Sequence, residues 1–224
     1  GVGMDAYYYT AENHYRLTST CPNVNFSDAT LLVNWIRLIK SENEINYMKE
    51  GAKLVETGMM TAYENIKPGV KQSYVAGKIQ NSLIGGNEEI NIGGEYAGLT
   101  TILASGVSAS ASHLTPKDNL FNNNEGTIIE LAGVKHRYHC PLSRTVYCGK
   151  PDSKISDTMK ITNEGVEQAI STIKPGKTAH DVAVAFWSVL EKNGIEKDSR
   201  LGYAIGVGYP PDWGEHTMSI RKND

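Results

Sequence analysis

Cysteine is scarce in this chain: the 224 residues include only three, Cys21, Cys140 and Cys148, and no two of them form a Cys-x-x-Cys pair. An odd number without paired spacing excludes an even disulfide framework and any Cys-x-x-Cys motif. We therefore expect reduced thiols in a protein of the cytoplasm.

Long apolar runs and clusters of basic residues are also missing. No apolar run approaches the ~20 residues that a membrane-spanning helix needs, and residues 1–10 lack the layout of a signal peptide. The formal net charge of −3, without a basic run, argues against a nucleic-acid partner. With 40% hydrophobic residues, the chain can bury the core of one large soluble domain.

The chain contains an internal repeat. Ile66-Lys67-Pro68-Gly69 recurs as Ile173-Lys174-Pro175-Gly176, an offset of 107 residues (66 to 173). Three further identities occur at the same offset: Val75, Ala76 and Leu83 match Val182, Ala183 and Leu190. Chance is the alternative, because Pro-Gly turns are common. Duplication is favoured because a long helix, a turn, a second helix and a glycine stop all match.

Each copy predicts a pair of helices. The first pair begins at the capping box Ser41-Glu42-Asn43-Glu44, continues to the Pro68-Gly69 break, and resumes over 73–83. The second pair is expected over 157–173 and 179–192. Strands are predicted over four segments: 98–104, 126–132, 143–148 and 201–208. This order indicates an α+β fold with helices on one face of a mainly antiparallel sheet.

The segment His136-x-x-His139-Cys140 is a candidate metal site. In a strand, residues three apart point to opposite faces, so the two histidines cannot share an ion unless a turn intervenes. Cys140 is also a candidate nucleophile beside His139, although adjacent side chains on an extended chain diverge. We favour a hydrogen-bonded loop at this segment over both the metal site and the cysteine nucleophile.

Glu130 is an isolated carboxylate in a strongly apolar predicted strand. Its neighbours Ile129 and Leu131 are expected to desolvate it, which raises the pKa of a carboxyl group and is costly without a partner or a function. His113 follows a loop of small residues, Ser105–Ser112, and is a candidate acid or base; a surface histidine is the alternative.

The segment Tyr209–Glu215, with the sequence YPPDWGE, combines two prolines, aromatic rings and two carboxylates. Such a rigid loop can bind a cationic or delocalised group by stacking and charge, through Asp212 and Trp213. A well-packed surface turn is the alternative.

Taken together, these motifs resemble the creatinase/aminopeptidase, or pita-bread, superfamily. The matching order is Arg37-x-x-Lys40-Ser41-x-x-Glu44-Ile45, the duplicated helix pairs, His113, the strand carboxylate Glu130, x-x-Arg144-Thr145 and a glycine-rich strand. The resemblance covers 36–224 and implies two similar halves around a curved antiparallel sheet, usually in a homodimer. Residues 1–35 look like the end of that family's N-terminal domain.

The departures from the metallopeptidase members concern their metal ligands. Those members carry an aspartate at the position of Glu130 and a second one eleven residues later, where this chain has Pro141. Their metal-binding histidine is replaced by Tyr203. Their two glutamate ligands would fall beyond Asp224, the last residue of this sequence, which ends before the family's further strands. The resemblance therefore implies a chain without the dinuclear metal centre, and we expect no metal and no cofactor.

Three longer blocks resemble the ectoine hydrolase branch of the superfamily: Glu130-x-Ala132-Gly133, Arg137–Thr145 and Gly208–Glu215. That branch hydrolyses the cyclic amidine ring of the osmolyte ectoine to N-acetylated diaminobutyrate. The resemblance implies a small-molecule substrate, with no membrane and no nucleic acid as partner.

The resemblance also implies roles for particular residues. Glu130 would be the nucleophile or general base, His113 would shuttle the proton, and Tyr203 would hydrogen-bond the substrate or Glu130. The substrate-binding candidates are Asp212, Trp213, Arg144 and His139. Arg144 would hold a substrate carboxylate, with a structural ion pair as its alternative role.

Two other functions remain open from the sequence. One is a hydrolase of the same superfamily with another substrate, such as a creatinase-like or Xaa-Pro aminopeptidase-like enzyme. The other is a catalytically inactive pita-bread fragment that acts as a binding module. The isolated carboxylate Glu130 speaks against an inactive site, because a buried charge without a function is costly.

Overall fold

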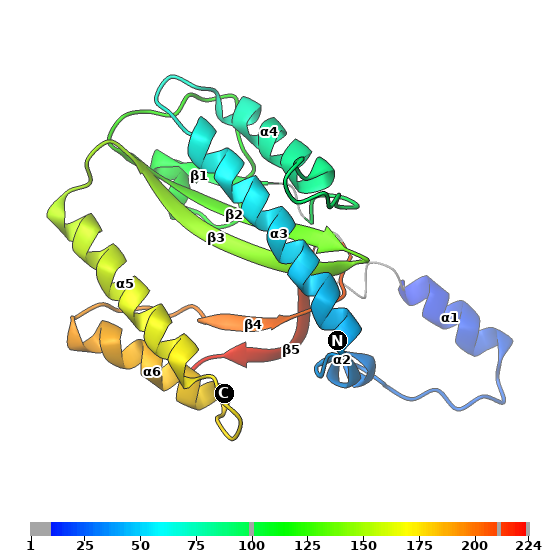
Figure 1. Ribbon diagram of the computed structural model, residues 1–224. Helices are drawn as coiled ribbons and strands as arrows, with labels where there is room; N and C mark the ends of the chain where they lie inside the picture. Colours follow the sequence, from blue (N-terminus) through cyan, green and yellow to red (C-terminus); the bar gives the residue numbers. More distant parts are fainter. Residues whose placement is uncertain (1–9, 99–100, 210–211, 223–224) are drawn as a thin grey trace.

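The computed structural model describes residues 10–98, 101–209 and 212–222. The helices are α1 (Ala11–Thr20), α2 (Leu32–Arg37), α3 (Glu42–Asn65), α4 (Gln72–Gly85), the 3₁₀ helix η2 (Gly106–Ser110), α5 (Ser153–Thr172) and α6 (Ala179–Lys192). The strands are β1 (Ile102–Ser105), β2 (Glu125–Lys135), β3 (Tyr138–Cys148), β4 (Gly202–Ile205) and β5 (Gly214–Ile220) (Figure 1). Residues 99–100 of the predicted first strand and the two prolines of the YPPDWGE segment lie outside the described residues.

Both predicted helix pairs are present, and their ends coincide at the offset of the repeat. Helices α3 and α4 end at 65 and 85, and α5 and α6 end at 172 and 192. The two turn glycines, Gly69 and Gly176, have φ of +84° and +85°, a backbone conformation that glycine adopts without steric cost. Helix α5 begins at Ser153 rather than at 157, because the Asp152 side chain accepts a hydrogen bond from the Ile155 amide at 2.8 Å and caps the helix earlier.

Helices α3 and α4 cover one face of the antiparallel sheet β1–β2–β3 (Figure 1). The main core lies between these two layers and includes Leu83, Leu103, Ile129 and Leu131. The helix approaches the sheet closely where two glycines face each other. A Cβ on Gly133 of β2 would lie 2.0 Å from the carbonyl oxygen of Gly51 on α3, so only a glycine fits at this position.

The His-rich segment forms the tip of a long hairpin. Strands β2 and β3 pair from Glu125 with Cys148 to Lys135 with Tyr138, and His136-Arg137 make the two-residue turn with φ of +48° and +68°. Two positive φ values are the signature of a type I′ hairpin turn. The sequence predicted two shorter strands with a loop between them. The prediction missed the hairpin because neither turn residue is Gly, Asn or Asp.

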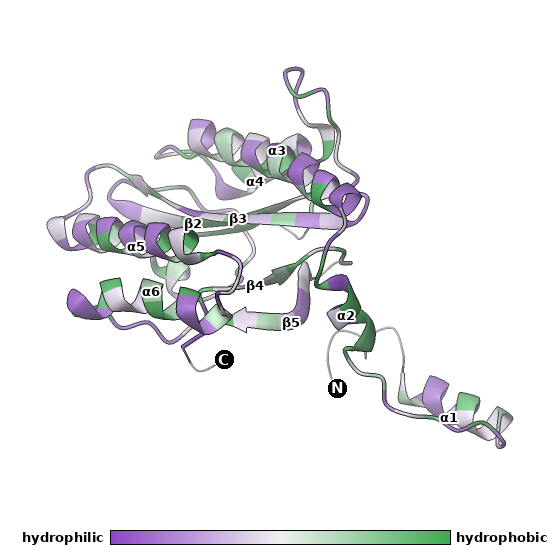
Figure 2. Ribbon diagram, turned by 60° about the horizontal axis from the view of Figure 1, so that its bottom comes forward, coloured by the Kyte–Doolittle hydropathy of each residue, from purple (hydrophilic) through white to green (hydrophobic). Residues whose placement is uncertain are grey.

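The sheet continues from the first half into the second. Strand β3 is joined to the chain after β4 by the isolated bridge between Tyr138 and Val207, and the His139 amide donates to the Gly206 carbonyl oxygen at 2.9 Å. Strand β4 then pairs antiparallel with β5, with a register shift between Tyr203 and Ile205. Figure 2 shows the resulting layers, with α3 and α4 above the first sheet and β4 and β5 below it.

The two helix pairs differ in what covers them. Helix α3 packs on the sheet, whereas α5 packs mainly on α6. Equivalent positions therefore differ in exposure: Ile66 is 5% exposed and its counterpart Ile173 is 61% exposed. The helix pairs themselves match, but strands cover the second pair only where α6 meets β5.

The segment that leads into α3 is tied to β3 and β5. The capping carboxylate Glu44 accepts hydrogen bonds from the amide and hydroxyl of Ser41 and from the Tyr138 hydroxyl, and these bonds lower the pKa of Glu44 to about 2. Burial, followed by the bond to Glu44, raises the pKa of Tyr138 to about 12. The Lys40 ammonium meets the Glu215 carboxylate on β5 at 2.6 Å, with side-chain exposures of 12% and 2%.

The ion pair between Lys40 and Glu215 yields a stability prediction. The substitution Lys40→Met is expected to lower the free energy of unfolding by about 3–5 kcal/mol, because it leaves the buried Glu215 charge without its partner. The matched control is Arg16→Met, which removes the exposed pair with Glu12 and should cost at most about 1 kcal/mol. Urea unfolding measures both values, and similar losses for the two variants would contradict the buried pairing.

The N-terminal helices are attached loosely compared with the rest. Helix α1 has no buried residue and lies away from the main body (Figure 1). Helix α2 contacts β5, where the Asn34 side-chain amide donates to the Glu215 carbonyl oxygen at 2.8 Å. The domain boundary predicted between residues 35 and 36 therefore falls inside α2. Within the described residues, no helix is both long and apolar enough to span a membrane.

Candidate active site

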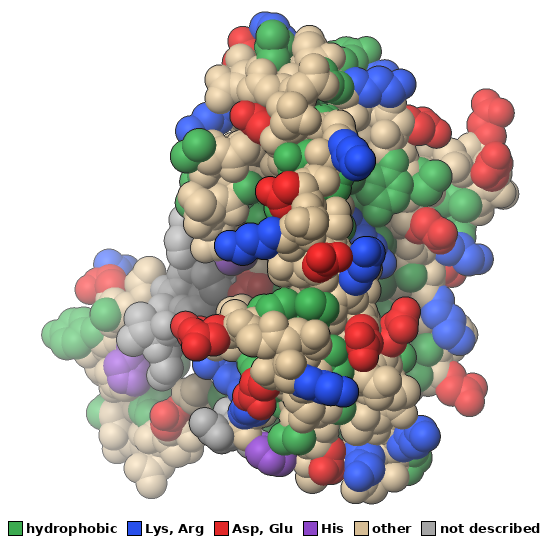
Figure 3. All heavy atoms as spheres, turned by 90° about the vertical axis from the view of Figure 1, so that its left-hand side faces the viewer, with side chains coloured by type: hydrophobic (Ala, Val, Ile, Leu, Met, Phe, Trp, Pro, Cys, Tyr) green, Lys and Arg blue, Asp and Glu red, His purple; other side chains and the backbone are tan. Residues whose placement is uncertain are grey.

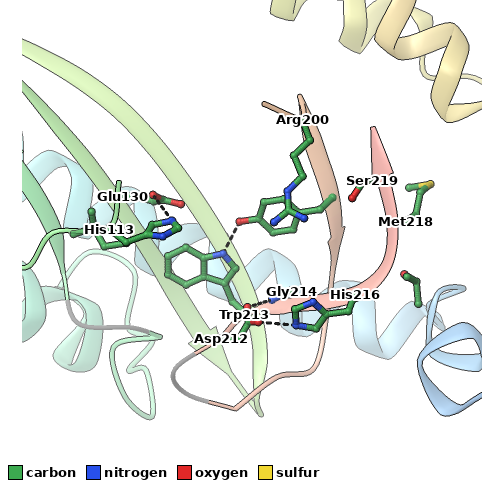
Figure 4. A pocket seen from close by; sticks show the side chains of 12 residues that line it. His113, Glu130, Arg200, Asp212, Trp213, Gly214, His216, Met218 and Ser219 are labelled. Carbon is green, nitrogen blue, oxygen red and sulfur yellow. Dashed lines mark hydrogen bonds and ion pairs between the residues drawn. The ribbon is translucent and has the colours of Figure 1, made fainter. Parts of the chain in front are cut away.

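A pocket of about 550 Å³ lies between the first sheet and the β4–β5 pair. Its lining comes from β1, β2, the loop after η2, and the segment from 200 to 219 (Figure 4). The lining residues are Ile102, His113, Glu130, Arg200, Tyr203, Asp212, Trp213, Gly214, His216, Thr217, Met218 and Ser219. Figure 3 views a face of the molecule that is hollowed between two lobes, with a carboxylate recessed in the hollow.

Glu130 lies on the pocket face of β2. Side chains alternate along a strand, so Ile129 and Leu131 point to the opposite face and join the core under α3 and α4. The Glu130 side chain is 24% exposed. The expectation that its apolar neighbours desolvate it is therefore wrong, because those neighbours do not share its face.

His113 faces Glu130 across the pocket. It follows η2 with φ of +59°, and its Nε2 lies 4.0 Å from the Glu130 Oε2 (Figure 4). That separation is too long for a direct hydrogen bond. The His113 side chain is 71% exposed, so it can exchange protons with solvent. The two groups line the same pocket and are close enough to contact one small ligand together.

Tyr203 and Trp213 are two further side chains that line the pocket. The Trp213 Nε1 donates a hydrogen bond to the Tyr203 hydroxyl oxygen at 2.6 Å (Figure 4). The Arg200 guanidinium lies 4.2 Å from the centre of the Tyr203 ring, within cation–π range. Burial raises the pKa of Tyr203, and the bond from Trp213 partly opposes this rise.

Asp212 is held at the edge of the pocket by two contacts. One carboxylate oxygen accepts from the Gly214 amide at 2.9 Å, and the other lies 2.6 Å from the His216 Nε2. His216 has φ of +56° within β5, a strained conformation for a non-glycine residue. Both oxygens of Asp212 are thus engaged, and its orientation relative to Trp213 is fixed.

The structure brings together five of the residues that the sequence singled out: Glu130, His113, Tyr203, Asp212 and Trp213. Two others lie elsewhere. Arg144 pairs with Ile129 across the hairpin and so lies on the opposite face from Glu130, with its guanidinium donating to the Ser143 carbonyl oxygen at 2.7 Å. It is not placed to hold a substrate carboxylate in this pocket.

His139 is fully buried and does not line the pocket. Its Nδ1 donates to the Arg137 carbonyl oxygen at 3.0 Å, and its Nε2 lies 3.4 Å from the Tyr96 hydroxyl. Burial lowers the pKa of His139, so the ring is neutral near pH 7. The expectation that His139 binds substrate is replaced by a supporting role under the loop that carries Asp212 and Trp213.

The candidate metal trio of the His-rich segment is separated in space. His136 lies at the hairpin tip, 3.4 Å from the Glu95 carboxylate, whereas His139 is buried and Cys140 faces α3. Burial raises the pKa of the Cys140 thiol, which disfavours a nucleophilic thiolate. Within the described residues, no group of three or more His, Cys, Asp or Glu side chains is arranged to hold a metal ion.

The sequence did not point to Arg200, His216 or the other pocket residues of β5. Arg200 is the last residue of a polar stretch that contains no motif. The sequence of β5 looks polar because the buried residue of this strand is the ion-paired Glu215. The one signal in the sequence was proximity, because Arg200 and His216 each lie within four residues of an identified motif.

Two helix pairs, related by an internal repeat, lie around a curved antiparallel sheet, and the pocket lies on the inner face of that sheet. This arrangement defines the pita-bread fold. Residues 46–223 match the metallopeptidase family M24, and the chain belongs to that family. The solved prolidase from Pyrococcus horikoshii superposes with a TM-score of 0.81 at 22% identity, covering 100% of this chain and 66% of its own. An X-Pro aminopeptidase from Thermotoga maritima gives 0.77 at 19% identity, with 95% and 58% covered. The predicted fold is confirmed.

Two curated relatives are more similar in sequence. An uncharacterised hydrolase/peptidase from Sinorhizobium fredii is 43% identical over 224 residues, and the ectoine hydrolase of Halomonas elongata is 41% identical over 228 residues. Each alignment covers 100% of this chain and 57% of the relative. The chain thus spans little more than half the length of these relatives. The resemblance to the ectoine hydrolase branch is confirmed at the level of sequence similarity.

Proposed function

We propose that the chain belongs to a hydrolase that opens the cyclic amidine ring of ectoine to give N-acetyl-diaminobutyrate. The observation that carries this proposal is the pairing of Glu130 and His113 in a pocket that Tyr203 and Trp213 also line. The 41% identity to the ectoine hydrolase of Halomonas elongata supports the choice of substrate.

The chemistry follows from the charge of the substrate. An amidinium carbon is already electrophilic because it shares a positive charge with two nitrogens. The Glu130 carboxylate attacks this carbon, and His113 delivers a proton to the ring nitrogen as its bond to that carbon breaks. Water then attacks the same carbon, its proton passes to His113, and Glu130 leaves as a carboxylate. The carbon ends as an amide, and one C–N bond of the ring has been hydrolysed.

The charges of the pocket suit a zwitterionic ligand. Asp212 supplies a fixed carboxylate near the cationic amidine, and the Arg200 guanidinium supplies a bidentate partner for the substrate carboxylate. Arg200 thereby takes the role that was expected of Arg144. A pocket of about 550 Å³ has room for such a small ring together with the water that the second step consumes.

The side chains at the family's metal positions do not fit a dinuclear metal centre. Pro141 pairs with Ala132 and so shares the face of Glu130, but its ring has no donor atom. The Tyr203 hydroxyl oxygen is already hydrogen-bonded by Trp213. Hard or borderline divalent metals in this family would need carboxylate and imidazole ligands there. The proposed mechanism accordingly assigns no step to a metal.

Chelation provides a direct test of this assignment. Dialysis against EDTA is expected to leave the rate of ectoine hydrolysis unchanged within about twofold, because Glu130 and His113 supply the chemistry. Ectoine turnover is measured by the appearance of N-acetyl-diaminobutyrate, and the metal content is measured by elemental analysis of the same samples. Two transition-metal ions per chain, with activity lost on their removal, would overturn the metal-free mechanism.

A further inference from the structure

The bond between Trp213 and Tyr203 has a fixed direction. An indole N–H can donate a hydrogen bond and cannot accept one, so the Tyr203 hydroxyl oxygen must be the acceptor of the 2.6 Å contact. A phenol hydroxyl carries one proton of its own, and that proton is then available for a different acceptor. Within the described residues, the Tyr203 hydroxyl has no protein acceptor for this proton, and Tyr203 lines the pocket.

We propose that Trp213 is a positioning residue that commits the Tyr203 hydroxyl to donating its proton into the pocket, toward the oxygen that becomes the amide oxygen of the product. This inference rests on the proposed function and deepens it. When water attacks the amidine carbon and loses its proton, negative charge develops on that oxygen. A donor that is already aimed at this position stabilises the charge without reorganising. Tyr203 keeps its proton throughout, so the step requires no other reactant.

The surroundings of both side chains support this role. Trp213 is 6% exposed and packs on Ile102 and Ala132, so its ring is held in one orientation and presents little surface for stacking on a ligand. Burial raises the pKa of Tyr203, which keeps the hydroxyl protonated near neutral pH. Tyr203 also occupies the position of the family's metal-binding histidine. A hydrogen-bond donor at position 203 therefore acts on the same region of the pocket as that histidine does in the metallopeptidases.

A double-mutant cycle tests the coupling. The substitution Trp213→Phe removes the N–H and keeps an aromatic ring; it is expected to lower kcat about 10-fold and to change KM less than threefold. Tyr203→Phe is expected to lower kcat about 100-fold. Because Trp213 acts through the Tyr203 hydroxyl, the double variant should have the kcat of Tyr203→Phe alone. A further 10-fold loss in the double variant, or an unchanged kcat in Trp213→Phe, would overturn the inference.

A second measurement needs no substrate. The Tyr203 pKa is followed by NMR of protein labelled with ¹³C at the tyrosine Cζ, with the signal assigned by its absence in Tyr203→Phe. Loss of the Trp213 N–H should raise the Tyr203 pKa, because donation to the oxygen favours the phenolate. An unchanged pKa would contradict the inference. Failure of the wild-type protein to turn over ectoine would instead contradict the proposed function.

If Trp213→Phe does not fold, benzothienylalanine at position 213 replaces it in both experiments. This residue keeps the shape of the indole and has sulfur in place of the N–H. It therefore removes the donor with little change in packing, and the same outcomes apply.

Discussion

Replacing Glu130 with glutamine is expected to lower the kcat for ectoine hydrolysis by at least ~10³-fold, because an amide oxygen is a poor nucleophile and a poor base. Glutamine has nearly the same shape, and the Glu130 side chain is partly exposed to the pocket rather than packed in the core. The melting temperature should therefore change by no more than a few degrees. Product formation followed by mass spectrometry, together with thermal unfolding of the same sample, separates the loss of chemistry from the loss of folding.

The matched control is Glu125→Gln on the same strand. Glu125 begins β2, accepts a hydrogen bond from the Asn122 side chain at 3.2 Å, and does not line the pocket. Its substitution should leave kcat within about twofold. A Glu130→Gln variant that retains more than a tenth of the wild-type rate would remove Glu130 from the reacting centre. Ectoine that binds to the wild-type protein without turnover would favour the binding-module alternative.

The helices could be predicted from the sequence because their signals are local. The capping box at Ser41 and Glu44 forms as the sequence indicated, with both reciprocal bonds present. The repeated Ile-Lys-Pro-Gly turns end α3 and α5 at equivalent positions. Each of these signals involves residues within four positions of one another, so no knowledge of distant contacts is needed.

The strands were predicted less well because their partners are distant in sequence. Strand β5 contains a buried Glu215 whose burial depends on Lys40, 175 residues away. No strand was predicted over this segment, because a charged residue at a buried position does not fit an apolar alternation. The hairpin of β2 and β3 was underestimated for local reasons, because its two turn residues are not Gly, Asn or Asp and Pro141 interrupts the strand pattern.

Site residues could be predicted from the sequence where a motif identifies both the residue and the residues next to it. Glu130 and Tyr203 belong to such motifs, and both line the pocket. Arg144 and His139 belong to motifs as well, but strand alternation and burial place them elsewhere. A motif identifies which residues matter in a family, whereas the face on which a side chain lies depends on the register with the neighbouring strand.

The contact between α3 and β2 leads to a large expected effect on stability. The substitution Gly133→Ala adds a Cβ that would lie 2.0 Å from the Gly51 carbonyl oxygen and 2.7 Å from the Val55 amide nitrogen. Both are backbone atoms of a helix and cannot rotate away, so α3 must move off the sheet and loosen the core beneath it. We expect the free energy of unfolding to fall by about 3 kcal/mol or more, and the melting temperature by roughly 6–12 °C.

Gly126→Ala is the matched control for this variant. Gly126 lies on the same strand, and an added Cβ would meet its nearest neighbour, the Tyr147 ring, at 3.7 Å, an ordinary van der Waals contact. Alanine is also less costly than glycine in a strand, so this variant should be neutral or slightly more stable. Urea and thermal unfolding of both variants measure the difference. Equal stabilities would mean that α3 is not held against β2 by direct backbone contact, and that Glu130, three residues before Gly133, is positioned by other means.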